Sequence, residues 1–304
     1  LCYNILLGRE YVHIGFYGIR RGARGNRLRT AGGAMAGHMV GGGAAMIELD
    51  HLVAGYEGMA ITPAMSGVIA AGSLTAIVGL NGCGKSTLLK TLAGFIPPVS
   101  GRLNWRKGRP VVGWLAQRHA LESQFPLLVR DVVSQGAWPR VSLLRCLGDD
   151  ERQRIAAALE RVGLSALANT PIEELSGGQF QRMLFARVMV QQAPLVMLDE
   201  PFTGVDVQTE ARIIALLREL RDEGCTMLVS THNLGSVSEF CDYTVMVKGT
   251  VLASGPTETT FTADNLELAF SGVLRHVTLT GAEERIITDD ERPFISHRAA
   301  EGQR

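Results

Sequence analysis

The stretch GLNGCGKST, residues 79–87, decides the fold of this chain. It overlaps the end of the apolar run LTAIVGL, which predicts a β-strand, and it runs into STLLKTLAG, which predicts a helix. The spacing G-x-x-x-x-G-K-[ST] between a strand and a helix is typical of a phosphate-binding loop. Its glycines let successive N–H groups turn toward phosphate oxygens, and the helix N-terminus adds a partial positive charge. The alternative is a glycine-rich turn that binds nothing, but the flanking strand and helix favour phosphate binding.

Two side chains of this loop have a direct chemical role. We expect Lys85 to reach the β- and γ-phosphates of a nucleotide and the Ser86 hydroxyl to bind magnesium. Cys83 takes a variable position of the motif. It could be a reactive thiol whose alkylation blocks ATP binding, but a small filler residue is the simpler interpretation. The predicted nucleotide-binding residues of the loop are Gly79, Leu80, Asn81, Gly82, Cys83, Gly84, Lys85, Ser86 and Thr87.

Acidic residues end the buried strand predicted for LVMLDE. Asp199 lies at the carboxyl end of this strand, where ligands gather in open α/β sheets, and we expect it to hold the magnesium through water. Glu200 can polarise the attacking water as a general base. The next strand ends in STHN, which brings His232 to the same edge, where it can contact the γ-phosphate or the water. The simpler interpretations are an acidic turn and a surface histidine.

Strands and helices alternate along the middle of the chain, which predicts an α/β fold with a mostly parallel sheet and right-handed connections. The segment TEARIIALLRELRD, residues 209–222, places its apolar residues on one helical face. A helix-rich region between positions 117 and 175 has DDERQRIAAALERVGL as its clearest element. It predicts a small helical subdomain inserted into the sheet domain, at about residues 118–175.

Composition divides the chain further and limits its partners. Residues 1–45 are rich in Gly, Ala and Arg and predict a disordered or non-native extension, with Met46 as a candidate start and a targeting peptide as the alternative. We expect residues 46–255 to form the nucleotide-binding domain and residues 256–304 to form a C-terminal extension with a frayed end. Basic and acidic residues number 30 each, so no global field favours nucleic acid. The five cysteines lack CxxC spacing and no apolar run could span a bilayer, which favours a reducing cytoplasm and a membrane role only through a partner chain.

The segment EELSGGQFQR, residues 173–182, predicts a helix start with two glycines that a cap does not need. Ser176 and Gln179 fit a capping box, which alone is a structural explanation. Gly177 and Gly178 each cost up to about 1 kcal/mol relative to alanine in a helix interior, though less in a first turn. Without side chains there, a phosphate can approach the bare N–H groups. The chain therefore has two predicted phosphate-binding helix starts, which could serve one nucleotide or two.

Together these motifs resemble the ATP-binding subunits of ABC transporters over roughly residues 47–255. LSGGQ after a phosphate loop is nearly diagnostic of that family. The resemblance implies a P-loop NTPase core with a mostly parallel sheet, an N-terminal antiparallel β part and an inserted helical subdomain. It also implies a homodimer that closes around two ATP molecules with Mg²⁺.

Further residue roles follow from this resemblance. Tyr56 of LVAGYEG would stack on adenine, Gln117 of WLAQR would contact magnesium, and Asp206 of TGVD would belong to the loop that crosses the dimer interface. The residues expected to act across the dimer are Ser176, Gly177, Gly178, Gln179 and Asp206. Those expected to bind magnesium are Ser86, Gln117 and Asp199, and the catalytic residues are Glu200, His232 and Lys85.

Two segments indicate a subtype. FPLLVRDVVSQG, residues 125–136, and NLELAFSGVLRHV, residues 265–277, look like the cassettes of bacterial importers of manganese, iron or zinc. Such an ATPase would sit peripherally on the cytoplasmic face of the inner (plasma) membrane, bound to integral membrane permease subunits. A periplasmic or lipoprotein metal-binding protein would deliver the cargo. The alternatives are an ABC ATPase for another cargo and a soluble ABC ATPase of DNA repair or translation; a P-loop kinase would not explain LSGGQ.

Overall fold

The computed structural model describes residues 44–116, 127–141, 147–232, 234–235, 237–248, 251–270, 274–278 and 285–288 of the 304-residue chain. The extension predicted for residues 1–45 lies outside these ranges up to position 43, and strand β1 (Ala45–Val53) begins at its last residue. The predicted frayed end lies outside them from residue 289. The domain boundaries therefore stay predictions.

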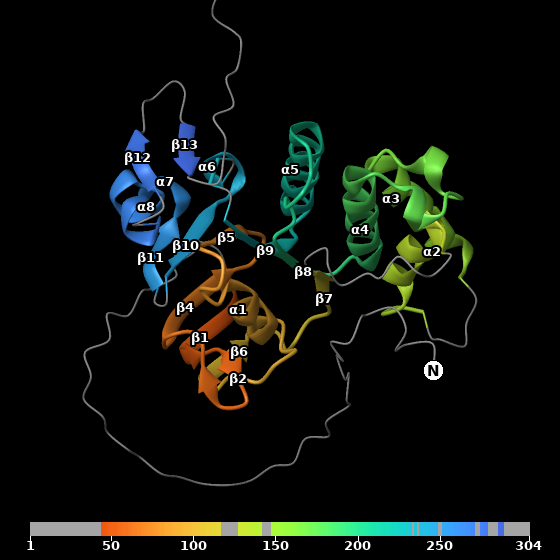
Figure 1. Ribbon diagram of the computed structural model, residues 1–304. Coiled ribbons are helices and arrows are strands. Elements are labelled where there is room, and N and C mark those ends of the chain that lie inside the picture. Colours follow the sequence, from red (N-terminus) through yellow and green to blue (C-terminus); the bar gives the residue numbers. More distant parts are fainter. Residues whose placement is uncertain are drawn as a thin grey trace, which may run out of the picture.

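A six-stranded sheet forms the centre of the molecule, in the order β11-β10-β5-β9-β8-β7 (Figure 1). Neighbouring strands from β10 to β7 pair in parallel, and β11 runs antiparallel to β10. Strands β5, β8 and β9 are fully buried and carry mainly apolar residues in their middles, as expected of a parallel sheet covered on both faces. The predicted mostly parallel α/β fold is confirmed. The strands are β5 (Leu74–Val78), β7 (Val112–Leu115), β8 (Leu195–Asp199), β9 (Thr226–Thr231), β10 (Tyr243–Val247) and β11 (Val251–Pro256).

A three-stranded antiparallel sheet, β4-β1-β6, precedes and adjoins this core. It combines β1 with β4 (Met65–Ala70) and β6 (Ser100–Trp105), and the hairpin of β2 (Gly55–Tyr56) and β3 (Met59–Ala60) lies between β1 and β4 in the chain. Helix α1 (Lys85–Leu92) buries its leucines in an apolar core shared by the two sheets. The N-terminal antiparallel part implied by the resemblance is thus confirmed.

A group of helices stands at one side of the central sheet (Figure 1). Helices α2 and α3 pack on α4. Arg140 joins them, since its guanidinium pairs with Glu151 at 2.9 Å and donates to the last carbonyls of α4, those of Val190 at 2.6 Å and Gln191 at 2.7 Å. The inserted helical region is therefore present, and α4, which follows it in sequence, packs on it too. The elements are α2 (Val129–Ser134), η3 (Gln135–Ala137), α3 (Asp149–Arg161), η4 (Ser165–Leu167), η5 (Ile172–Glu174) and α4 (Gly177–Gln191).

The sheet separates two apolar cores. Alternate residues of β5 face opposite cores: Ala76 and Val78 join the core of the helical side, and Ile77 joins the core of the N-terminal sheet.

None of the helices in the described part of the chain combines the length and the apolar composition that a membrane span needs. The remaining elements are α5 (Val207–Asp222), α6 (Val237–Phe240), α7 (Thr257–Thr260), α8 (Ala263–Phe270), β12 (Leu274–Thr278) and β13 (Arg285–Thr288).

Candidate functional site

The predicted phosphate loop connects β5 to α1 at the carboxyl edge of the central sheet. Gly84 is the N-cap of α1 with φ of 96°, and Gly82 has φ of 81°, so both adopt the left-handed conformation that glycine permits. Gly79 is required for another reason. A Cβ atom there would lie 2.2 Å from the carbonyl oxygen of Val247 in β10. The loop thus has the strand–turn–helix geometry that turns backbone N–H groups toward a phosphate.

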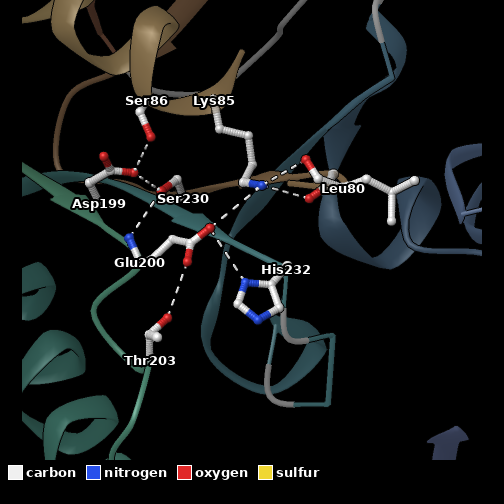
Figure 2. Close-up of polar contacts among 9 residues, drawn as sticks. Leu80, Lys85, Ser86, Asp199, Glu200, Thr203, Ser230 and His232 are labelled. Atoms are coloured by element: carbon white, nitrogen blue, oxygen red, sulfur yellow. Dashed lines mark hydrogen bonds and ion pairs between the residues drawn. The ribbon is translucent and has the colours of Figure 1, made fainter. Parts of the chain in front are cut away.

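Lys85 folds back into this loop. Its ammonium group donates to the carbonyl oxygens of Gly79 at 2.7 Å and Leu80 at 3.0 Å, and its side chain is only 4 % exposed (Figure 2). A carboxylate oxygen of Glu200 lies 3.8 Å from the ammonium nitrogen. A buried ammonium is held here by two carbonyls and a nearby carboxylate, and it lies within reach of an anion bound in the loop.

Asp199 ends β8 as a buried carboxylate that accepts two hydroxyl groups on one oxygen. Ser86 donates to its Oδ1 at 2.9 Å, and Ser230 of β9 donates to the same atom at 2.6 Å (Figure 2). These are hard oxygen ligands of the kind that Mg²⁺ takes, usually one or two from the protein with water and phosphate as the others. The oxygens of Ser86 and Asp199 therefore fit a magnesium ion.

Glu200 has an unusual backbone and a well-held carboxylate. Its φ is 48°, a left-handed value that is uncommon for a residue other than glycine. Its N–H donates to the carbonyl oxygen of Ser230 at 3.1 Å and to the hydroxyl of Ser230 at 3.0 Å. Thr203 donates to the Oε2 atom at 3.2 Å, and Nδ1 of His232 lies 3.4 Å from Oε1.

These contacts set the charge of Glu200. The hydrogen bond with His232 contributes most to holding the pKa of the Glu200 carboxyl below its usual value. The charges of His232 and Lys85 and the Thr203 hydroxyl act in the same direction, whereas burial opposes them. A carboxylate that stays ionised beside a bound phosphate can accept a proton from water.

The structure therefore brings Lys85, Ser86, Asp199, Glu200 and His232 together at one sheet edge, as the sequence predicts (Figure 2). The sequence analysis missed the two hydroxyl residues that hold the carboxylates. Ser230 is the first residue of STHN and Thr203 is the first residue of TGVD, so both lay within quoted motifs.

Other predicted nucleotide-binding residues surround the loop. Asn81 is exposed, Cys83 is half-buried, and Thr87 is buried in α1. Tyr56 is 38 % exposed in the β2–β3 hairpin. A Cβ atom at Gly84 would lie 3.0 Å from Ile61, which follows this hairpin, so the hairpin region adjoins the loop. Gln117 lies outside the described residues.

The second predicted phosphate-binding helix start, at α4, lies apart from α1 (Figure 1). Its capping box is confirmed. The Ser176 hydroxyl accepts from the Gln179 N–H at 3.3 Å, and the Gln179 side chain accepts from the Ser176 N–H at 2.8 Å. Gly178 also has a packing reason that the sequence analysis did not find. A Cβ atom there would lie 2.6 Å from the Thr209 hydroxyl oxygen and 3.2 Å from a carboxylate oxygen of Asp206.

Asp206 is the N-cap of α5. Its carboxylate accepts from the N–H of Thr209 at 2.9 Å and from the Thr209 hydroxyl at 2.8 Å. The backbone hydrogen bond is the largest cause that lowers the pKa of Asp206, followed by that from the hydroxyl. An ionised carboxylate at a helix N-terminus is favourable. The start of α5 thus lies directly beside the start of α4.

Comparison with known proteins gives consistent results. A family model described as ABC transporter matches residues 63–203. The chelated iron transport system membrane protein YfeB of Yersinia pestis is 46 % identical over 241 residues, 74 % of this chain and 81 % of that protein. The manganese transport system ATP-binding protein MntA of Synechocystis sp. is 44 % identical over 209 residues, 66 % of this chain and 80 % of that protein. Among solved structures, an inward-facing metal-chelate type ABC transporter matches with a TM-score of 0.67 at 26 % identity, covering 75 % of this chain and 89 % of that one.

Proposed function

Because the chain belongs to the ABC transporter family, we propose that it powers the import of a transition-metal ion, manganese, iron or zinc, through separate membrane subunits. The family and the ATPase activity predicted from the motifs are confirmed by the comparisons. One observation carries the proposal: the polar cluster of Lys85, Asp199 and Glu200 occurs in a chain whose similar proteins are named for iron and manganese transport.

ATP would bind with its phosphates over the start of α1. Lys85 would exchange the carbonyl oxygens of Gly79 and Leu80 for the β- and γ-phosphates, since an ammonium prefers an anionic acceptor. Mg²⁺, held by Ser86 and Asp199 and by Gln117 outside the described residues, would neutralise phosphate charge. Tyr56 would stack on adenine, for which its partial exposure beside the loop is suitable.

Glu200 would act as the general base of hydrolysis. As the water oxygen bonds to the γ-phosphorus, the bond from that phosphorus to the β–γ bridging oxygen breaks, one water proton passes to Glu200, and ADP and phosphate leave. The low pKa of Glu200 keeps the base ionised before the reaction. His232, 3.4 Å from Glu200, would orient the carboxylate and contact the γ-phosphate.

The separation of α4 from α1 supports a dimer. If the N–H groups of Gly177 and Gly178 bind a phosphate, that phosphate belongs to a nucleotide held by another copy of the chain, because the loop of the same chain lies elsewhere (Figure 1). Ser176, Gln179 and Asp206 would complete this contact across the dimer. Two ATP molecules would close the homodimer, and hydrolysis would let it reopen.

Membrane partners would convert this closure into transport. We propose that the chain docks peripherally on permease subunits at the cytoplasmic face of the inner membrane, and that a periplasmic or lipoprotein metal-binding protein delivers the ion. ATP would drive the cycle because the closed dimer has the higher affinity for it. The names of the similar proteins favour transport over the alternatives of DNA repair and translation.

Metal uptake tests this proposal. A bacterial strain lacking its own copy of the gene would be complemented with the wild-type chain, with Lys85→Ala, or with Glu258→Gln, whose exposed side chain lies in α7 away from the site. Uptake of labelled manganese, iron and zinc would be measured at matched protein levels. We expect the wild type and Glu258→Gln to restore uptake of at least one ion and Lys85→Ala to restore none. Failure of the wild type with all three ions, or full uptake with Lys85→Ala, would refute the proposal.

A further inference from the structure

A buried glutamine ties the start of α4 to the residue that follows Glu200. Gln181 lies in the second turn of α4, and its side chain is 3 % exposed. Its Nε2 atom donates to the carbonyl oxygen of Pro201 at 2.8 Å. We propose that Gln181 is a positioning residue for Glu200 and couples the start of α4 to the general base.

The backbone at Glu200 shows why this hydrogen bond matters. A left-handed φ of 48° in a residue other than glycine is strained and persists only where its surroundings enforce it. On one side, Ser230 accepts the Glu200 N–H with two oxygens. On the other side, Gln181 holds the next peptide, Pro201–Phe202, through the Pro201 carbonyl. The proline ring fixes φ of Pro201, so this peptide limits how the backbone can leave Glu200. The orientation of the Glu200 side chain is therefore fixed from both sides.

The start of α4 also contacts the far end of the same segment. Gly178 lies so close to Thr209 and Asp206 that no Cβ atom would fit without a shift. Between the two ends, Phe202 packs edge-on against Phe240 with ring centroids 5.7 Å apart. A displacement of α4 must therefore carry the segment 200–206 with it, because close-packed interiors transmit strain.

This coupling rests on the proposed dimer. There the start of α4 faces the ATP of the partner, whereas Glu200 of the same chain serves its own ATP. A shift of α4 on engagement of the partner's nucleotide would consequently move Glu200 with it through Gln181 and Gly178. Hydrolysis at the two sites then depends cooperatively on ATP.

Two glutamines of α4 supply the variant and its control. Gln181→Met keeps the length of the side chain and removes the donor. Gln191→Met does the same at the other end of α4, where the Gln191 side chain donates to the Val112 carbonyl at 3.3 Å. Steady-state hydrolysis by the purified full-length chain would be measured against ATP concentration. We expect Gln181→Met to lower kcat about tenfold or more, to leave KM within about twofold and to bring the Hill coefficient to 1. Gln191→Met should match the wild type.

A pH profile separates positioning from general damage to the fold. In Gln181→Glu the introduced carboxylate cannot donate to the Pro201 carbonyl, but it regains an O–H donor when it is protonated. We expect the kcat of this variant, relative to the wild type, to rise as the pH falls. A flat ratio would overturn the proposal, as would an unchanged kcat and Hill coefficient in Gln181→Met, or an equal loss in Gln191→Met. If the wild type hydrolyses ATP cooperatively and Gln181→Met behaves in the same way, the role of Gln181 is refuted, but the proposed dimer is not. A wild type without ATP-dependent dimerisation would remove the proposed dimer as well.

Discussion

Replacing Glu200 with glutamine should separate ATP binding from hydrolysis. The amide keeps the shape of the side chain, and its oxygen can still accept the Thr203 hydroxyl, which lies 3.2 Å from the carboxylate. It cannot accept a proton from water at neutral pH. General-base catalysis contributes about 10²- to 10⁴-fold to a rate. We therefore expect kcat to fall by that factor, which raises the barrier by roughly 3 to 5 kcal/mol at 1.36 kcal/mol per tenfold.

The same substitution should have only a small effect on folding. Lys85 loses a carboxylate at 3.8 Å but keeps its two carbonyl acceptors at 2.7 and 3.0 Å. The charge of Lys85 is one of the lesser causes of the lowered pKa of Glu200, so that loss amounts to about 1 kcal/mol in the ATP-free protein, or roughly 2 to 4 °C in Tm for a domain of this size. Bound ATP restores an anionic partner to Lys85 and no longer meets the repulsion of the Glu200 carboxylate. The stabilisation by ATP should therefore equal or exceed that of the wild type.

Single-turnover phosphate release measures the loss of hydrolysis, and thermal unfolding with and without Mg-ATP measures the effect on stability and binding. Because hydrolysis would let the proposed dimer reopen, Glu200→Gln should stay dimeric with ATP, which gel filtration detects. Glu258→Gln makes the same chemical change at an exposed position of α7 and should behave as the wild type. A loss in kcat of less than tenfold would refute Glu200 as the base. Disappearance of the thermal shift on adding ATP would refute the argument that its carboxylate is dispensable for binding.

Three further variants test other parts of the site. His232→Ala removes the largest cause of the low pKa of Glu200, so the acid limb of the kcat–pH profile should move to higher pH; an unmoved limb would contradict the assigned cause. Glu151 has its pKa lowered chiefly by its hydrogen bond with Arg140, so its contribution to stability is present above the unfolded pKa and is lost as the pH falls through the folded one. Urea unfolding of Glu151→Gln should show lower stability at neutral pH and a weaker acid dependence than the wild type, and identical curves would count against this ion pair. Tyr56→Ala should raise KM for ATP several-fold with little change in kcat, whereas Tyr56→Phe should keep the wild-type KM; equal effects of both would exclude stacking.

Local patterns in the sequence were sufficient for much of the fold. The capping box of α4 and the phosphate loop before α1 are short motifs whose residues contact one another within a few positions, so their geometry follows from spacing. The buried strands β5, β8 and β9 are likewise recognisable as short apolar runs. Because ligands bind at the carboxyl ends of the strands in such sheets, the sequence also predicted that Asp199 and His232 lie at the same edge.

Contacts between distant segments could not be predicted in this way. Gln181 reads in the sequence as one more polar residue of a helix, and nothing in its neighbours indicates that it meets the carbonyl of Pro201. The sequence analysis explained the glycine at position 178 by the approach of a phosphate. The structure adds a second reason, the closeness of Thr209 in a different helix. Ser230 lies within a strand that looks uniformly buried. The hydrogen bond that it donates to Asp199 and the two that it accepts from the Glu200 N–H became visible only with the neighbouring strand in place. Such pairings depend on the order of strands and helices in space, which periodicity does not encode.

The left-handed backbone at Glu200 restricts which amino acids can replace it. Glycine adopts this conformation without strain and asparagine tolerates it, whereas valine, isoleucine and threonine are poorly accommodated. Two separate requirements therefore act on this position: hydrolysis requires a carboxylate, and the backbone requires a residue that tolerates a left-handed φ. A complete set of substitutions there would give two different rankings: stability would favour glycine and asparagine, and turnover would favour the acid. Glutamate holds the position as a compromise between the two, at the cost of a strain that its neighbours must sustain.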